Sequence, residues 1–142
     1  MPVAEKALGG GKDAPRLPKG RLIVVDEDRK DLSYYSAILT LAGYEVRGIS
    51  SFSDGAAFLE QERFDLVIVS QGGAAFEGQA VLARAIELDR RTPVLVLTYN
   101  PDVKTYMDAM QLGARDYVEK PLAPAEISKL VAKHLHRQGK AV

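Results

Sequence analysis

The sequence predicts a single α/β domain built on a parallel sheet, and two regularities carry that prediction. Short apolar runs, typical of strands buried on both faces, alternate with segments whose apolar residues recur at helical spacing. The strand-like runs begin at residues 22, 44, 65, 94 and 116, at intervals of 22, 21, 29 and 22 residues. Each interval leaves room for one strand, one helix and two turns, which is the unit that joins neighbouring parallel strands.

The first strand and helix follow from one continuous apolar run and one glycine. Residues 22–25 are all aliphatic, as expected of a strand covered by helices on both faces. Residues 29–42 place apolar side chains on one helical face, and Gly43 supplies a helix stop. Residues 44–49 alternate in polarity and are predicted to form an edge strand.

The middle of the chain is expected to hold two helices and a strand. Ser53 is placed to cap a helix over 53–62, and residues 64–69 form the third strand. A loop rich in glycine and alanine spans 71–77, which makes this interval the longest, and a helix is expected over 78–89.

The last elements are marked by prolines. A strand is predicted over 93–98, and Asn100 followed by Pro101 indicates the start of a helix that runs to residue 112. A short strand over 116–119 and a final helix over 124–137 complete the pattern.

The two ends of the chain differ from this pattern. Residues 1–20 contain four glycines and three prolines and little that could recur on an apolar face. We therefore expect a flexible leader over 1–20, a folded domain over 21–138 and a short tail over 139–142. Because so few residues follow the last helix, any output activity is expected to lie on another chain.

Composition excludes several classes of function. Lysine plus arginine and aspartate plus glutamate number 19 each, so the net charge is zero and neither nucleic acid nor an anionic membrane is an expected partner. The absence of cysteine excludes disulfides, thiol catalysis and thiolate metal sites. No apolar run approaches the roughly 18 residues that span a bilayer, and no signal core is present, so a soluble cytoplasmic protein is expected.

Polar residues follow the predicted strands. If right-handed crossovers order the strands 2-1-3-4-5, the result is a flavodoxin-like, doubly wound (βα)5 sheet in three α/β/α layers. The carboxyl ends of its strands then converge on one crevice. The polar residues at those ends are Asp26, Glu27, Ser70, Thr98, Glu119 and Lys120.

Four segments in order give the region 21–137 a specific resemblance to a known family. They are 23–28 (IVVDED), 65–70 (DLVIVS), 93–98 (PVLVLT) and 117–122 (YVEKPL). Together they resemble the receiver domain of bacterial two-component response regulators. In that family the acidic pair, here Asp26 and Glu27, helps to bind magnesium.

The resemblance also assigns roles to the other strand ends. Ser70 stands where the family has the aspartate that accepts a phosphoryl group, and Gly78 matches a family glycine eight residues later. Thr98 and Lys120 occupy positions that contact the phosphoryl group, and Tyr117 occupies that of an aromatic ring that changes rotamer on activation. The resemblance further implies a cis peptide bond between Lys120 and Pro121.

Ser70 departs from the family chemistry. A neutral hydroxyl is neither the carboxylate nucleophile of aspartyl phosphorylation nor a third anionic ligand for magnesium. We therefore expect weak or absent Mg²⁺ binding by Asp26 and Glu27, no required cofactor, and a direct ion pair from Lys120 to one of these acids. Tyr99 stands where the family usually has a small residue, and it is expected to cover the pocket.

Simpler interpretations of the same residues remain open. Asp26 and Glu27 could be a solvated strand end, Thr98 could cap the following turn, and Tyr117 could be a packing residue.

The preferred hypothesis is a pseudo-receiver that is not an enzyme. It would bind a signalling protein, such as a kinase or an output protein, or a second copy of itself, through the helix after strand four, strand five and the final helix. One alternative retains phosphoryl control at Ser70 or another residue. A remote alternative is a hydrolase with Ser70 as nucleophile and Lys120 as base, but Ile68 replaces the glycine of a nucleophile elbow, and both histidines lie on the final helix.

Overall fold

The computed structural model describes residues 17–140, with the side chains of the final helix described as far as Leu135. Residues 1–16 of the predicted leader and 141–142 of the predicted tail lie outside the described residues. Within residues 17–140, five strands and five helices alternate: β1 Arg21–Val25, α2 Arg29–Leu41, β2 Glu45–Ile49, α3 Phe52–Gln61, β3 Leu66–Ser70, α4 Gln79–Leu88, β4 Val94–Thr98, α5 Val103–Leu112, β5 Asp116–Glu119 and α6 Pro124–Lys140.

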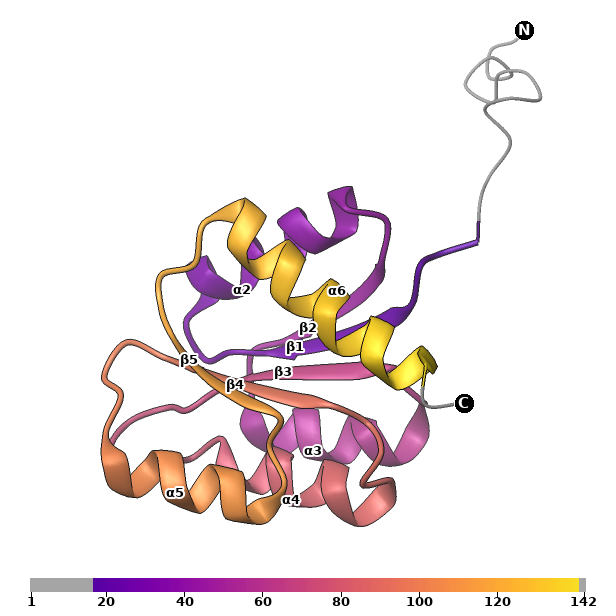
Figure 1. The fold of residues 1–142 in the computed structure, drawn as a ribbon. Coiled ribbons are helices and arrows are strands. Elements are labelled where there is room, and N and C mark those ends of the chain that lie inside the picture. Colours follow the sequence, from indigo (N-terminus) through magenta and orange to yellow (C-terminus); the bar gives the residue numbers. More distant parts are fainter. Residues whose placement is uncertain (1–16, 141–142) are drawn as a thin grey trace, which may run out of the picture.

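The strands form one parallel sheet in the order β2-β1-β3-β4-β5, so the predicted fold class is confirmed. Helices α2 and α6 cover one face of the sheet, and α3, α4 and α5 cover the other (Figure 1). Because β1 lies between β2 and β3, the chain reverses its winding direction beside β1. Sheets of this kind usually form a crevice at that point, and we call the region at the carboxyl ends of β1 and β3 the crevice.

Alternation along the strands divides the core into two layers. Ile23 and Val25 of β1 pack toward α3 and α4, whereas Leu22 and Val24 pack toward α2 and α6. All four side chains are at most 1 % exposed. Burial on both faces explains the continuous apolar runs, and each such side chain contributes about 1.5–3 kcal/mol of transfer free energy.

Two predicted helix starts are wrong by about two residues. The N-cap of α3 is Ser51, whose hydroxyl accepts a hydrogen bond from Asp54 N, and the predicted cap Ser53 lies within the helix. The N-cap of α5 is Asp102 in place of Asn100, because its carboxylate accepts the Thr105 N–H at 2.8 Å. In both cases a second good capping residue stands nearby in the sequence, and the tertiary path of the loop selects one of them.

Among residues 17–140, no helix combines the length and the hydropathy that crossing a lipid bilayer requires.

Candidate functional site

The polar residues predicted at the strand ends lie at one edge of the sheet. Ser70 of β3 is in register with Leu97, directly before Thr98 of β4, which is itself in register with Glu119 of β5. Most of these residues are buried: as whole residues, Asp26 is 2 % exposed, Ser70 5 %, Thr98 3 % and Lys120 4 %. Glu27, by contrast, is exposed.

Lys120 is the centre of a buried ion cluster. Its Nζ donates to Asp26 Oδ2 at 2.8 Å and to Asp31 Oδ2 at 2.9 Å. The predicted pairing with an acid of the first strand is therefore present, and the partner is Asp26. The second partner is Asp31, on α2, which the sequence analysis did not identify.

Helix capping places the second carboxylate. Asp28 is the N-cap of α2 and accepts the Lys30 and Asp31 N–H groups at 2.9 and 3.1 Å. Asp28 N in turn donates to Asp26 Oδ1 at 2.9 Å. This chain of hydrogen bonds fixes the first turn of α2 against the end of β1, and so holds the Asp31 carboxylate beside the one from Asp26.

Burial and hydrogen bonding shift the pKa values of Lys120 and Asp26 in opposite directions. Burial alone would lower the pKa of Lys120, but hydrogen bonds to Asp26 and Asp31 outweigh it and raise that pKa. Burial raises the pKa of Asp26, and the hydrogen bonds from Lys120 and Asp28 N oppose this effect. Lys120 therefore carries its charge at neutral pH and neutralises the buried carboxylate.

Tyr99 covers the ion cluster on the solvent side. Its hydroxyl donates to Asp31 Oδ1 at 3.0 Å, and the Lys120 Nζ lies 4.9 Å from the centroid of its ring. The side chain is 49 % exposed, so one surface of the ring faces water while the other contacts the ammonium. These contacts put Tyr99 where a pocket cover was predicted.

Both strand-end hydroxyls accept hydrogen bonds from the backbone of their own loops. Ser70 Oγ accepts from Gly72 N at 3.2 Å, and Thr98 Oγ1 accepts from Asn100 N at 3.0 Å. For Thr98 this is the turn-capping role that the sequence left open. A Cβ at Gly78 would collide with the carbonyl oxygen of Ser70, so the loop returns to the strand end at a position where only glycine fits.

The donor set does not suit a divalent cation. Both carboxylate oxygens of Asp26 already accept hydrogen bonds, Glu27 is exposed, and Ser70 contributes only a hydroxyl. Among the described residues, no group of three or more His, Cys, Asp or Glu side chains is arranged to hold a metal ion. The positive charge beside Asp26 and Asp31 is supplied by Lys120, and hard cations such as Mg²⁺ prefer several free oxygen ligands.

Tyr117 and Gln71 form a second polar connection near the crevice. The Tyr117 hydroxyl donates to Gln71 Oε1 at 2.6 Å and accepts from Asp102 N at 3.2 Å. Lys120 follows the same strand and is joined to Pro121 by the cis peptide bond that the resemblance implied. Tyr117 is thus more than a packing residue, because its hydroxyl joins two loops.

Sequence reasoning missed Asp31 and Gln71, for different reasons. Asp31 had a usable signal: it is an acid in the first turn of the helix that leaves the acidic strand end. Gln71 had none, since it opens a loop of glycine and alanine and nothing in the pattern shows that its side chain is 2 % exposed.

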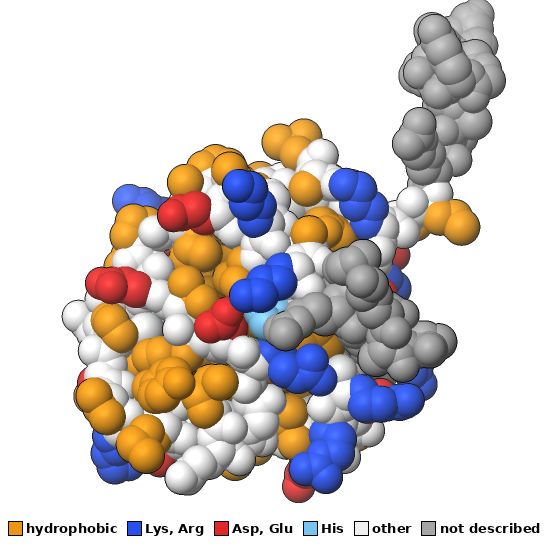
Figure 2. Space-filling model, viewed as in Figure 1, with side chains coloured by type: hydrophobic (Ala, Val, Ile, Leu, Met, Phe, Trp, Pro, Cys, Tyr) orange, Lys and Arg blue, Asp and Glu red, His pale blue; other side chains and the backbone are white. Residues whose placement is uncertain are grey.

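An exposed apolar surface lies beside Tyr117, on α5. Val103 is 74 % exposed, Met107 51 % and Tyr106 47 %, and the Tyr106 ring packs edge-on against Tyr117 with a centroid distance of 5.8 Å. Figure 2 shows hydrophobic side chains gathered at the lower left, over α5. We call Val103, Tyr106 and Met107 the α5 surface.

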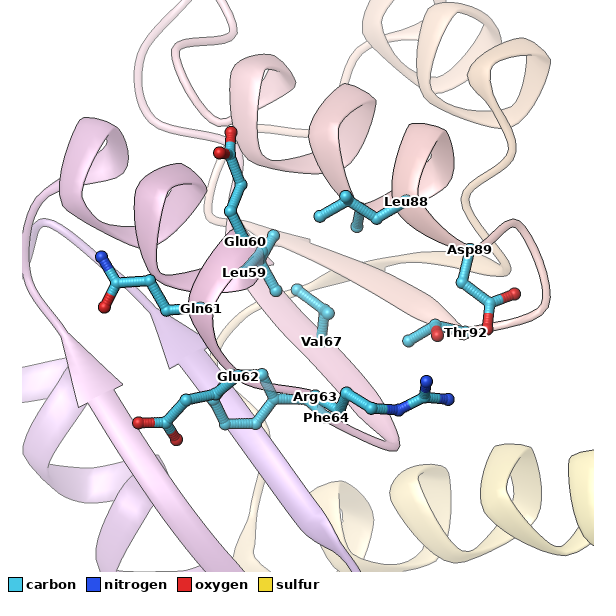
Figure 3. Close-up of a pocket in the computed structure, with 11 residues that line it drawn as sticks. Leu59, Glu60, Gln61, Glu62, Arg63, Phe64, Val67, Leu88, Asp89 and Thr92 are labelled. Atoms are coloured by element: carbon cyan, nitrogen blue, oxygen red, sulfur yellow. The ribbon is translucent and has the colours of Figure 1, made fainter.

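A separate cavity of about 270 Å³ lies at the opposite end of the strands, between the carboxyl ends of α3 and α4. In Figure 3, Leu59, Val67 and Leu88 point toward its centre, while the carboxylate of Glu62 points away. It is separated from the ion cluster by the length of the sheet and contains none of the predicted site residues.

Comparisons with known proteins agree with this geometry. The response regulator receiver domain family matches residues 22–132. The alginate biosynthesis transcriptional regulatory protein AlgB of Pseudomonas aeruginosa is 32 % identical over 117 residues, which are 82 % of this chain and 26 % of AlgB. The transcriptional activator protein IrlR of Burkholderia pseudomallei is 32 % identical over 117 residues, 82 % of this chain and 51 % of IrlR. The chain thus spans between about a quarter and a half of these relatives.

Solved structures show the same fold. A CheY-like receiver domain from Methanospirillum hungatei JF-1 superposes with a TM-score of 0.82 at 26 % identity. The superposition covers 89 % of this chain and 100 % of that domain. A response regulator from Chloroflexus aurantiacus gives 0.74 at 27 % identity, with 84 % and 98 % covered. With the family match over 22–132 and the strand-end residues in place, the chain belongs to the family of response regulator receiver domains.

Proposed function

We propose that this receiver domain is a cytoplasmic signalling module that acts by protein–protein contact, without phosphorylation at Ser70 and without catalytic activity. The observation that carries the proposal is the Lys120 ammonium, held by Asp26 and Asp31 at 2.8 and 2.9 Å. Both carboxylates thus have an internal cation as hydrogen-bond partner, so neither depends on a metal ion for a positively charged neighbour.

Three features support the loss of phosphoryl control. Ser70 offers a neutral oxygen, and its hydroxyl already accepts the Gly72 N–H. Thr98 Oγ1 likewise accepts a hydrogen bond from Asn100 N. Tyr99 covers the ammonium from the solvent side. A phosphoryl donor would have to displace this ring. Few carboxylate oxygens are free to hold a magnesium ion there, and the attacking group would be a neutral hydroxyl.

The surface that we propose for the partner consists of α5, β5 and α6. The α5 surface exposes Val103, Tyr106 and Met107, and a hollow of about 290 Å³ beside it is lined by Val103, Tyr106 and Tyr117 together with Pro101 and Asp102. Exposed aromatic and methionine side chains around a hollow are typical of interaction sites. We propose that the partner bound at this surface is a signalling protein. The alternative partner is a second copy of this chain.

Phosphorylation assays test the proposal directly. The parent protein is incubated with acetyl phosphate and Mg²⁺ and examined by intact mass spectrometry, and no phosphoryl adduct is expected. The matched variant is Ser70→Asp, which adds a carboxylate at the strand end and is expected to gain affinity for Mg²⁺ and beryllofluoride. Ser70→Asn, of similar size and without charge, is the control and should gain neither.

A phosphoryl adduct on the parent protein would contradict the proposal. Mapped to Ser70 or to another crevice residue, it would favour the alternative in which phosphoryl transfer still controls the domain. The hydrolase alternative is tested with a serine-directed phosphonate. No label is expected on Ser70, because Lys120 is a charged ammonium between two carboxylates and is a poor base.

A further inference from the structure

Gln71 is a buried polar residue whose side-chain amide makes hydrogen bonds through both its nitrogen and its oxygen. It directly follows Ser70, it is 2 % exposed, and its Nε2 donates to the Gly73 carbonyl oxygen at 3.2 Å. Its Oε1 accepts the Tyr117 hydroxyl at 2.6 Å. The amide therefore connects the loop after β3 to a residue of β5.

Tyr117 extends the connection to a third segment. Its hydroxyl oxygen, having donated to Gln71, accepts the Asp102 N–H at 3.2 Å. Burial raises the pKa of the Tyr117 phenol, so at neutral pH it keeps the proton that it donates.

Asp102 sets the start of α5. Its carboxylate accepts hydrogen bonds from Thr105 N and Thr105 Oγ1, both at 2.8 Å, and its carbonyl oxygen accepts from Tyr106 N at 2.9 Å. A shift of Asp102 must therefore move the first turn of the helix, which includes Val103 and Tyr106. The position of the α5 surface depends on where Asp102 is held.

We propose that Gln71 is a positioning residue for the α5 surface and acts through the Tyr117 hydroxyl. The chain of hydrogen bonds from Gln71 through Tyr117 to Asp102 joins the loop after Ser70 to the first turn of α5. The inference goes beyond the proposed function and does not rest on the loss of phosphorylation at Ser70, because it concerns bonds that form without any ligand.

The chemistry of an amide suits this position. Gln71 needs one acceptor for Tyr117 and one donor for Gly73, and an uncharged amide supplies both in a buried site. Leucine of similar size would remove the acceptor of the half-buried Tyr117 hydroxyl and so lose one net hydrogen bond. Glutamate would keep the acceptor and lose the donor.

The first experiment removes only the hydroxyl of Tyr117. Tyr117→Phe is expected to increase amide hydrogen exchange at Asp102 by about five- to ten-fold, which corresponds to the loss of one net hydrogen bond, and to shift the amide resonances of Asp102 and Val103. Tyr34→Phe is the matched control. It also deletes a tyrosine hydroxyl bonded to the backbone, at the Leu122 carbonyl oxygen, and it should leave exchange at Asp102 unchanged.

The second experiment asks whether Gln71 acts through Tyr117. Gln71→Leu should raise exchange at Asp102 as much as Tyr117→Phe does, although residue 71 does not bond to Asp102. Gln71→Glu, which keeps the acceptor oxygen, should restore exchange to within about two-fold of the parent. Adding Gln71→Leu to Tyr117→Phe should produce no further increase, because the pathway is already broken.

Two results would overturn the inference. One is unchanged exchange at Asp102 in Tyr117→Phe. The other is an effect of Gln71→Leu of equal size in the parent and in the Tyr117→Phe background, which would show that Gln71 supports the loop without acting through Tyr117. If Gln71→Leu fails to fold, Tyr117→Phe and Gln71→Glu still decide the question.

Discussion

The crevice at the strand ends and the α5 surface differ in which side chains are buried and which are exposed. In the crevice, charged groups are buried: the side chains of Lys120 and Asp26 are only 2 and 3 % exposed and they satisfy one another. On α5, apolar groups are exposed, with Val103 at 74 %. A buried charge that is already paired has little to offer a ligand, whereas an exposed apolar side chain gains free energy when a partner covers it.

This difference separates the two regions to which we assign different roles. In the crevice the Lys120 ammonium is held by two carboxylates, whereas the α5 surface, which we propose contacts another protein, is exposed. The two regions are nevertheless joined, because Gln71 follows Ser70 in the crevice and its amide bonds to Tyr117 beside α5.

The largest effect is expected from breaking the ion cluster. Lys120→Met removes the ammonium and leaves the Asp26 carboxylate buried without a counter-ion, which should lower the free energy of unfolding by about 3–5 kcal/mol. Urea denaturation followed by circular dichroism measures the change. Lys104→Met is the matched control on α5, since its ion pair with Asp108 lies at the surface, and no measurable change is expected.

A double substitution distinguishes the lost charge from lost packing. Asp26→Asn combined with Lys120→Met should be more stable than Lys120→Met alone, because the uncompensated carboxylate is gone. Equal stabilities of the single and double variants would mean that Lys120 contributes chiefly through the packing of its aliphatic chain.

Alkaline pH should weaken the crevice before it affects the α5 surface. The pKa of Lys120 is raised in the folded protein above the ordinary value of about 10.4, so the folded state binds this proton more tightly than the unfolded state does. The resulting stabilisation is complete below about pH 10.4 and is lost as the pH rises through the folded-state pKa. Urea denaturation between about pH 8 and 11 should therefore show the parent approaching Lys120→Met in stability. A difference that stays constant over this range would contradict the assignment.

The smallest effect on stability is expected at the α5 surface. Val103→Thr with Met107→Gln should change the free energy of unfolding by no more than about 0.5 kcal/mol, since both side chains are largely exposed. The same pair of substitutions should weaken binding to a partner or self-association, measured by analytical ultracentrifugation and by binding assays with candidate signalling proteins. If binding were unaffected while other surfaces changed it, the α5 surface would lose its proposed role.

The fold could be predicted because its signals are local and repeated. Apolar runs such as 22–25 and the glycines after helices mark each βα unit, and parallel strands necessarily bring residues such as Asp26 and Lys120 to one edge. The helix starts were less accurate, since Ser51 and Ser53 are both good caps and only the loop path distinguishes them.

The candidate site was predictable in composition but less so in its bonds. The pairing of Lys120 with Asp26 followed from charge and position, whereas the sequence left Glu27 as an equal candidate and gave no weight to Asp31. Which carboxylate reaches the ammonium depends on how α2 leaves β1, and Asp28 sets that geometry by capping the helix. The role of Gln71 depends on a tyrosine 46 residues away and has no local signal at all.

The ion cluster also has a consequence for the order of folding during synthesis. Lys120 follows Asp26 by 94 residues, so a nascent chain that has not yet reached the fifth strand carries both aspartates without their cation. The ion pair between Lys120 and Asp26 can form only after nearly the whole domain has been synthesised. This contact therefore forms late and only in a chain that contains all five strands. Fragments that end before residue 120 lack the ammonium that bonds to Asp26 and Asp31, and should be held in the native arrangement less firmly than the full domain.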